Sequence, residues 1–162
     1  MAVQDAQETA TGGRTSASRA AALLTVCEFP GTHIVQLARI LGLTHSATVR
    51  IVDALTAEGL IARSPAGGDA RRVSLRATAE GERRGSEIQS ARTEALTQLL
   101  RPLTQGQREE LAAILDTMLG GKPHLREEAC HICRFCAHSA CSGPDCPVGR
   151  SVEASGGESE EG

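Results

Sequence analysis

Apolar residues in the stretch 16–59 recur at helical spacing in three successive segments, and each segment is followed by residues that favour a helix end. The repeating positions are Ala20, Leu23, Leu24 and Cys27 in the first segment, Ile34, Leu37, Ala38 and Leu41 in the second, and Thr48, Ile51, Val52 and Leu55 in the third. The segments are followed by Phe29-Pro30-Gly31, Gly42 and Gly59. Thr44 stands where an N-cap belongs, just before the third segment. The pattern predicts three short helices.

After residue 59 the spacing of apolar residues changes from a helical period to an alternating one. Residues 60–63 form a short apolar strand candidate, and Val73 and Leu75 alternate with polar neighbours. The intervening residues 64–70 are rich in turn formers, with Gly67-Gly68-Asp69 at the tip. Two such strands joined by a glycine-containing loop are typical of a β-hairpin.

Two further helices follow the hairpin. Thr78 can cap a long helix that Pro102 brings to an end, and Thr104 with Gln107 fits a capping box that opens a last helix. Gly120-Gly121 stops the last helix. Their apolar positions are Ile88, Ala95, Leu96, Leu99, Leu100, Leu103, Leu111, Ile114, Leu115, Met118 and Leu119. We assign the leucines of both helices to a core or a dimer seam.

Length and composition exclude several classes of protein. A chain of 162 residues is expected to hold one domain with appendages. Its only aromatic residues are Phe29 and Phe135, too few for a stacking platform for single-stranded nucleic acid. The apolar runs are too short to span a bilayer, and the polar, acidic start does not resemble a secretory signal. We therefore expect a soluble protein of the cytoplasm.

Charge is distributed unevenly along the chain. Residues 14–84 hold ten arginines and six acidic residues, whereas residues 85–162 hold seven basic and twelve acidic ones. The overall net charge is −3. A basic segment joined to an acidic remainder suits a module that binds a polyanion with one face.

Three short helices followed by a hairpin predict a winged helix-turn-helix. Gly42 and Thr44 lie in the turn between the second and third helices, where glycine relieves strain and threonine caps the next helix. The start of the third helix, residues 45–50, is then left to enter a major groove of DNA, which accommodates one helix.

The run Leu43-Thr44-His45-Ser46-Ala47-Thr48-Val49-Arg50-Ile51-Val52-Asp53-Ala54-Leu55, continued by Glu58-Gly59-Leu60-Ile61, resembles the recognition helix of MarR-type transcriptional regulators. Asp69-Ala70-Arg71-Arg72 resembles the wing of that family, and Leu75-Arg76-Ala77-Thr78-Ala79-Glu80-Gly81 resembles its hinge into a long dimerisation helix. Leu99-Leu100-Arg101-Pro102-Leu103-Thr104 matches its entry to the final helix. The resemblance covers roughly residues 16–120.

The resemblance implies a homodimer on a pseudo-palindromic operator in double-stranded DNA, with recognition helices in major grooves and wings in minor grooves. It places Arg71 at the wing tip, where narrow minor grooves concentrate negative potential, and Asp69 as the residue that holds the loop. The implied DNA-binding residues are Thr44, His45, Ser46, Thr48, Arg50, Asp69, Arg71 and Arg72. We assign Asp53 to an ion pair. Members of this family have a further helix where this chain has a polar arm.

Five cysteines follow the last helix in the order Cys130-x2-Cys133-x2-Cys136-x4-Cys141-x4-Cys146-Pro147. Four thiolates can enclose zinc in a tetrahedral shell, and a two-residue spacer lets two sulfurs converge on one ion. We predict a structural zinc site formed by Cys133, Cys136, Cys141 and Cys146, with the spacing of a zinc knuckle. His131 and His138 are assigned no ligand role, and Cys27 is a small apolar residue of the core.

Two alternatives stay open for these cysteines. Cys130, Cys133, Cys136 and Cys146 resemble the ligand arrangement of a ferredoxin iron–sulfur cluster, with Cys130 as the alternative fourth ligand. Metal-free thiols that form disulfides on oxidation are the third possibility, with Arg126 and Arg134 near enough in sequence to lower their pKa values.

The expected fold is mainly α (α+β): a winged helix-turn-helix with a β-hairpin wing and C-terminal dimerisation helices. The expected organisation is a disordered arm (1–15), a DNA-binding domain (16–77), dimerisation helices (78–121), a cysteine-rich metal-binding segment (122–150) and a disordered acidic tail (151–162). We expect the cysteine-rich segment to pack beside the dimer helices and partly to replace the family's first helix.

The sequence thus predicts a DNA-binding transcriptional regulator, modulated by metal or redox state and without catalytic activity. No Gly-rich phosphate loop, nucleophile elbow or metalloenzyme spacing is present in the chain. The alternative is a zinc-knuckle-like RNA or protein interaction module on a winged-helix scaffold.

Overall fold

The computed structural model describes residues 16–66, 69–121, 125–137 and 146–156. Three helices come first: α2 (Ala17–Glu28), α3 (Ile34–Leu41) and α4 (His45–Ala57). Ser16 caps α2 through its side-chain oxygen, which accepts a hydrogen bond from the N–H of Arg19, and Thr44 caps α4 in the same way. The three helices predicted from the hydrophobic period are therefore confirmed.

The sheet has three antiparallel strands in the order β1-β3-β2. They are β1 (Thr32–His33), β2 (Ile61–Ala66) and β3 (Asp69–Ala77). The hairpin of β2 and β3 is confirmed, although its strands extend further than predicted and place Asp69 within β3. Strand β1 was not predicted, because two residues are too few to show a period; it pairs Thr32 with Leu75.

The core lies where α2 meets the other two helices, the sheet and the start of the next helix. Leu23, Val26, Leu37, Val52, Leu55, Ile61, Leu75 and Ile88 are all at most 2% exposed. Most of them lie at the predicted helical or alternating positions. Aliphatic packing of this kind provides most of the free energy that stabilises the winged helix.

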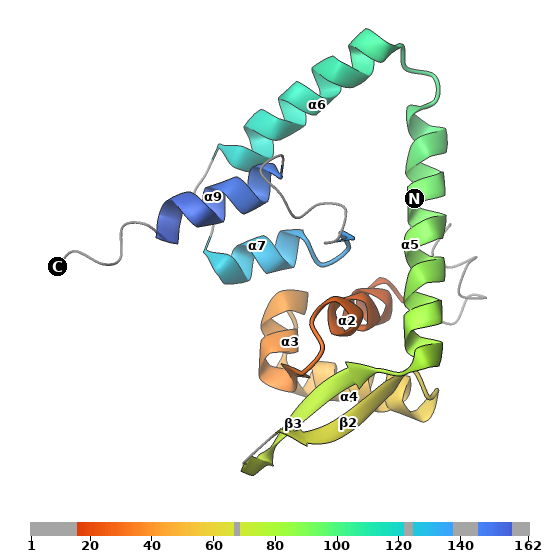
Figure 1. The fold of residues 1–162 in the computed structure, drawn as a ribbon, viewed down its shortest axis with the longest axis vertical. Helices are drawn as coiled ribbons and strands as arrows, with labels where there is room; N and C mark the ends of the chain where they lie inside the picture. The colour runs from red at the N-terminus through yellow and green to blue at the C-terminus, as the bar shows by residue number, and fades with distance from the viewer. Residues whose placement is uncertain (1–15, 67–68, 122–124, 138–145, 157–162) are drawn as a thin grey trace, which may run out of the picture.

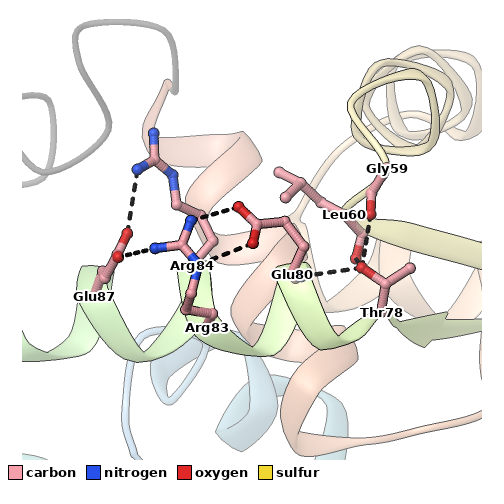
Figure 2. A network of polar contacts seen from close by, with 8 residues as sticks. Gly59, Leu60, Thr78, Glu80, Arg83, Arg84 and Glu87 are labelled. Atoms are coloured by element: carbon pink, nitrogen blue, oxygen red, sulfur yellow. Dashed lines mark hydrogen bonds and ion pairs between the residues drawn. The ribbon is translucent and has the colours of Figure 1, made fainter.

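Two long helices carry the chain away from this core: α5 (Ala79–Leu100) and α6 (Gln105–Gly120) (Figure 1). Thr78 joins the sheet to α5: its hydroxyl donates to the carbonyl of Gly59 at 2.6 Å and accepts from the N–H of Gly81 at 3.0 Å. Figure 2 shows this junction beside the ion pairs of Arg83 with Glu80 and Glu87. The predicted capping box of Thr104 and Gln107 is present at the start of α6.

The cysteine-rich part contains two helices that the sequence analysis did not predict: α7 (Arg126–Ile132) and α9 (Pro147–Gly156). Helix α9 packs along the end of α6, and α7 lies between α9 and α3 (Figure 1). Residues 151–156 therefore correct our expectation of a disordered tail from residue 151. The physical reason is that Pro147 favours a helix start and that α9 buries Val148 and Ser151. The helix therefore continues into the residues rich in Gly, Ser and Glu that follow residue 150.

The architecture agrees with the predicted fold class, a mainly helical winged helix-turn-helix with a small antiparallel sheet. The expected arm and residues 157–162 lie outside the described residues. In the described ranges, no helix has the length and hydropathy needed to span a membrane.

Candidate nucleic-acid interface

The turn between α3 and α4 is held by backbone hydrogen bonds that use a left-handed glycine. Gly42 has a φ of 66°, and its N–H donates to the carbonyl of Arg39 at 3.1 Å. The N–H of Leu43 donates to the carbonyl of Ala38 at 3.0 Å, so two carbonyls in the last turn of α3 are satisfied. Thr44 then accepts from the N–H of Ala47 at 3.2 Å. These contacts set the direction in which α4 leaves the turn.

The outward face of α4 begins at its first residue. His45, Ser46, Arg50 and Asp53 are exposed along one side of the helix. Asp53 accepts from the guanidinium of Arg63 on β2, which confirms the predicted ion pair. Exposed hydrogen-bonding side chains at the N-terminal end of a helix are what a major groove contact requires.

Thr48 corrects the predicted set of DNA-binding residues. It is completely buried, and its hydroxyl donates to the carbonyl of Thr44 at 3.0 Å. The physical reason is the helical period: Thr48 shares the inward face with Val52 and Leu55, which are also fully buried. Thr44 is exposed, but its hydroxyl is already engaged as the cap of α4.

The distal end of the wing carries the remaining predicted DNA-binding residues. Backbone pairing jumps from Pro65 opposite Val73 to Ala66 opposite Asp69, so residues 70–72 of β3 form a bulge. Arg71 and Arg72 lie on this bulge, whereas the positions of their side chains and that of Asp69 are outside the described part. Bulges near the end of a hairpin redirect side chains away from the sheet.

The cysteines are only partly brought together. Cys130, Cys133 and Cys136 line one cleft formed by α7 with α2 and α3. Cys146 instead lies at the start of α9, where its sulfur accepts from the N–H of Gly149 at 3.3 Å. Cys141 is outside the described residues. Within the described ranges, no three His, Cys, Asp or Glu side chains are grouped closely enough to hold a metal ion.

Two titratable groups near these helices have shifted pKa values. Burial raises the pKa of the Cys27 thiol to about 11, and the carboxylates of Glu82 and Glu28 add to the shift. Cys27 packs against the core, as predicted, and stays protonated at neutral pH. Burial also lowers the pKa of Arg92 on α5, which nearby Cys136 partly opposes.

Comparison with known proteins finds a family model and solved structures that are similar to this chain. Residues 13–72 match the model of the MarR family. The winged helix of this chain is similar to that of the MarR family. The resemblance inferred from the recognition helix, the wing and the hinge is therefore confirmed. No curated protein sequence is significantly similar to this chain.

Several solved structures share the same fold over most of their length. Wild-type MarR from E. coli in its apo form is 19% identical, with a TM-score of 0.63 over 72% of this chain and 88% of that one. A mutant of MepR from S. aureus is 21% identical, with a TM-score of 0.65 over 73% and 88%. A probable transcriptional regulator from Pseudomonas aeruginosa is 24% identical, with a TM-score of 0.58 over 72% and 87%.

One contact at this MarR-type turn was missed by sequence reasoning. His131 of α7, which we had assigned no role, lies against Gly42 and is hydrogen-bonded to the carbonyl of Ile40 at 2.8 Å. These residues are 91 positions apart, so no local pattern could indicate the contact. The hint available in the sequence was Gly42 itself, since a glycine leaves room for a neighbouring side chain.

Proposed function

We propose that this protein is a non-enzymatic, DNA-binding transcriptional regulator that binds a pseudo-palindromic operator as a homodimer. The observation that carries the proposal is the exposed start of α4, where His45, Ser46 and Arg50 face outward beyond the Thr44 cap. In this assignment, Arg50 contacts a phosphate or a base in the major groove, and Arg71 enters the flanking minor groove.

The apolar surface of α5 and α6 supports the homodimer. Helix α6 has no buried residue, and Leu99, Ile114 and Met118 are 61%, 51% and 70% exposed. Leu96 and Leu115 are exposed beside them. Aliphatic side chains gathered on two consecutive helices require a covering partner, and a second copy offers the same surface in return. Two copies would present two recognition helices to two half-sites, one helical turn of DNA apart.

Modulation by the cysteine-rich segment is part of the proposal. Zinc is the first candidate cofactor, held by Cys133, Cys136, Cys141 and Cys146; an iron–sulfur cluster that includes Cys130 and a metal-free thiol switch are the alternatives. Support comes from Cys130, Cys133 and Cys136, which line one cleft. Within the described residues these sulfurs do not form a ligand group of three, and the predicted ligand Cys141 lies outside those residues.

Metal content and absorption separate these three states. Protein purified without oxygen should be analysed for zinc, iron and labile sulfide, and its visible spectrum recorded. One zinc ion per chain in colourless protein supports the zinc site, whereas a brown protein containing iron supports the cluster. Protein that contains neither and loses free thiols reversibly on oxidation supports the switch.

The DNA-binding proposal is tested with a duplex selected from a random-sequence pool by the wild-type protein. Arg50→Ala and Arg71→Ala should each weaken binding about tenfold, measured by fluorescence anisotropy, because each removes a contact worth about 1–3 kcal/mol. Arg108→Ala is the matched control, since it removes the same charge from the exposed surface of α6. Equal affinity of all three variants would contradict the assignment of α4 and the wing.

A competition assay addresses the RNA-binding alternative. Phe135, the aromatic residue such a module would present, packs instead against the core. We therefore expect single-stranded RNA not to displace the selected duplex. Displacement at equal concentration would favour the alternative.

A further inference from the structure

Helix α7 contacts the turn that positions the recognition helix. A carbonyl only accepts hydrogen bonds, so the Nδ1–H of His131 donates to the carbonyl of Ile40 at 2.8 Å. The His131 ring also lies against Gly42: a Cβ built at Gly42 would lie 3.0 Å from its Cε1. The ring thus occupies the space beside a left-handed residue whose conformation sets the path from α3 into α4.

The segment after α7 contacts α5 and the core. Phe135 packs against the core, and its carbonyl accepts from the side-chain amide of Gln89 on α5 at 3.2 Å. The guanidinium of Arg92 lies 4.4 Å from the centre of the Phe135 ring, and that of Arg134 lies 5.2 Å from it. Helix α7 is therefore held at two points, one on the turn and one on α5.

Three cysteines lie next to these two contacts in the chain: Cys130 directly precedes His131, Cys136 directly follows Phe135, and Cys133 lies between the two. Cys130, Cys133 and Cys136 face a cleft whose opposite wall includes Ile40, the residue that binds His131, and Leu24 of α2. The volume of the cleft is about 10 Å³, room for about one water molecule. An adduct that extends from one of these half-buried sulfurs into the cleft is larger than this space, so its accommodation requires α7 to move away from α2 and α3.

We propose that α7 transmits the chemical state of these thiols to the recognition helix within one chain. A small electrophile adds to Cys130, Cys133 or Cys136. The thiol first gives its proton to water, the thiolate sulfur forms a C–S bond to one carbon of an electron-poor double bond as the carbon–carbon π bond breaks, and the adjacent carbon takes a proton back from water. The adduct pushes α7 outward, His131 leaves Gly42 and Ile40, and the α3–α4 turn loosens. His131 is a positioning residue in this scheme, which rests on the proposed function only for its consequence for DNA affinity.

The experiment uses the full-length protein without DNA and N-ethylmaleimide as the electrophile. Hydrogen exchange at the amides of Gly42 and Leu43 is measured before and after alkylation, with the modified residues identified by mass spectrometry. We expect alkylation to accelerate exchange about fivefold, the effect of losing one hydrogen bond. In His131→Ala, exchange should be fast before alkylation and should change little after it.

Three control variants isolate the contact. Ile132→Ala alters an exposed neighbour on the same helix and should behave as the wild type. His131→Asn keeps a side-chain N–H donor and should restore slow exchange in part. A Cys130→Ser, Cys133→Ser and Cys136→Ser triple variant should not respond to the reagent, although Cys141 and Cys146 remain. Circular dichroism establishes that each variant is folded.

The exchange measurement tests the role of α7, and a separate DNA-binding measurement tests the proposed function. Unchanged exchange after alkylation of the three cysteines would overturn the role of α7, as would an equal response in His131→Ala and wild type. Affinity for the selected duplex is measured in parallel. Failure to bind any duplex would refute the proposed function, while the exchange data would still decide the role of α7.

Discussion

Thr48 and Arg50 differ by two positions, yet they face opposite environments. Thr48 is fully buried and Arg50 is exposed, because successive residues of a helix are rotated by about 100°. A threonine on the buried face satisfies its hydroxyl locally by donating to a carbonyl of the preceding turn, here that of Thr44. Residue type alone therefore does not distinguish a buried threonine from one that binds DNA.

A single substitution at Thr48 tests this assignment. Thr48→Val keeps the shape and removes only a hydroxyl whose acceptor, the carbonyl of Thr44, also binds the N–H of Thr48. We expect duplex affinity within about twofold of wild type and a change in unfolding free energy below about 1 kcal/mol. Anisotropy and urea denaturation provide the two measurements. A tenfold loss of affinity in a variant of unchanged stability would instead make Thr48 a DNA contact.

Cys27 provides a prediction about reactivity and pH. Its pKa is raised to about 11 by burial, so its thiolate is scarce at pH 8 and alkylation should be slower than at an unfolded cysteine. Because the folded pKa exceeds the unfolded one, this group's contribution to stability is fully present below about pH 9 and is lost as the pH rises toward 11. Site-resolved alkylation rates between pH 7 and pH 10 measure the effect. Rapid alkylation at pH 8 in folded protein would contradict it.

At the scale of elements, the winged helix meets α5 through one very close approach. A Cβ built at Gly81 would lie 2.0 Å from the carbonyl oxygen of Leu60, which also accepts a hydrogen bond from the N–H of Thr78. Any side chain at this position would push α5 away from the junction shown in Figure 2. The orientation of the long helix relative to the recognition helix therefore depends on a glycine.

A pair of glycine substitutions makes this dependence measurable. Gly81→Ala should lower the unfolding free energy by about 1–3 kcal/mol, because backbone atoms must move to accept the methyl group. Gly106→Ala is the matched control: a Cβ there meets nothing within 4 Å, and helix propensity predicts a gain of about 0.5–1 kcal/mol. Thermal and chemical denaturation of both variants provide the comparison. Equal unfolding free energies of the two variants would contradict the prediction, because they would show that the backbone at Gly81 and Leu60 moves apart at little cost.

Across the whole molecule, the two ends of the fold differ in what they expose. The winged helix has a buried aliphatic core and a polar recognition face, whereas the later part of α5 and α6 leave apolar side chains in contact with water. Helix α9 covers part of α6 through contacts that include the ion pair of Arg150 with Asp116. The remaining apolar surface is the part of the chain that a second copy is proposed to cover.

The dimer is tested by placing a charge on that surface. Leu99→Glu should shift the protein from dimer to monomer at micromolar concentration, because an unpaired carboxylate would be buried at the interface at a cost of several kcal/mol. Sedimentation equilibrium measures the mass. Thr97→Glu, exposed and on the opposite side of α5, is the control and should stay dimeric. A monomeric wild type, or a Leu99→Glu variant that stays dimeric, would exclude this surface as the seam.

The amino-acid sequence by itself determined the order of the elements and the residues that begin and end the helices. Thr44, Thr78 and Thr104 cap their helices as predicted because an N-cap acts on an N–H only three residues away. The hairpin followed from its alternating pattern in the same way. Both partners of such an interaction lie within a few residues of each other in the chain, so a local sequence pattern can predict it.

Contacts between distant segments were decided only by the tertiary structure. Strand β1 exists because Thr32 meets Leu75, and His131 lies on the α3–α4 turn because α7 packs against α3. The cysteine spacing predicts a shared ligand shell, whereas only the fold shows that Cys133 and Cys136 line a cleft beside α7 and that Cys146 directly precedes α9. The free energy of these arrangements comes from burial between segments that are far apart along the chain. No local pattern records which segments will meet.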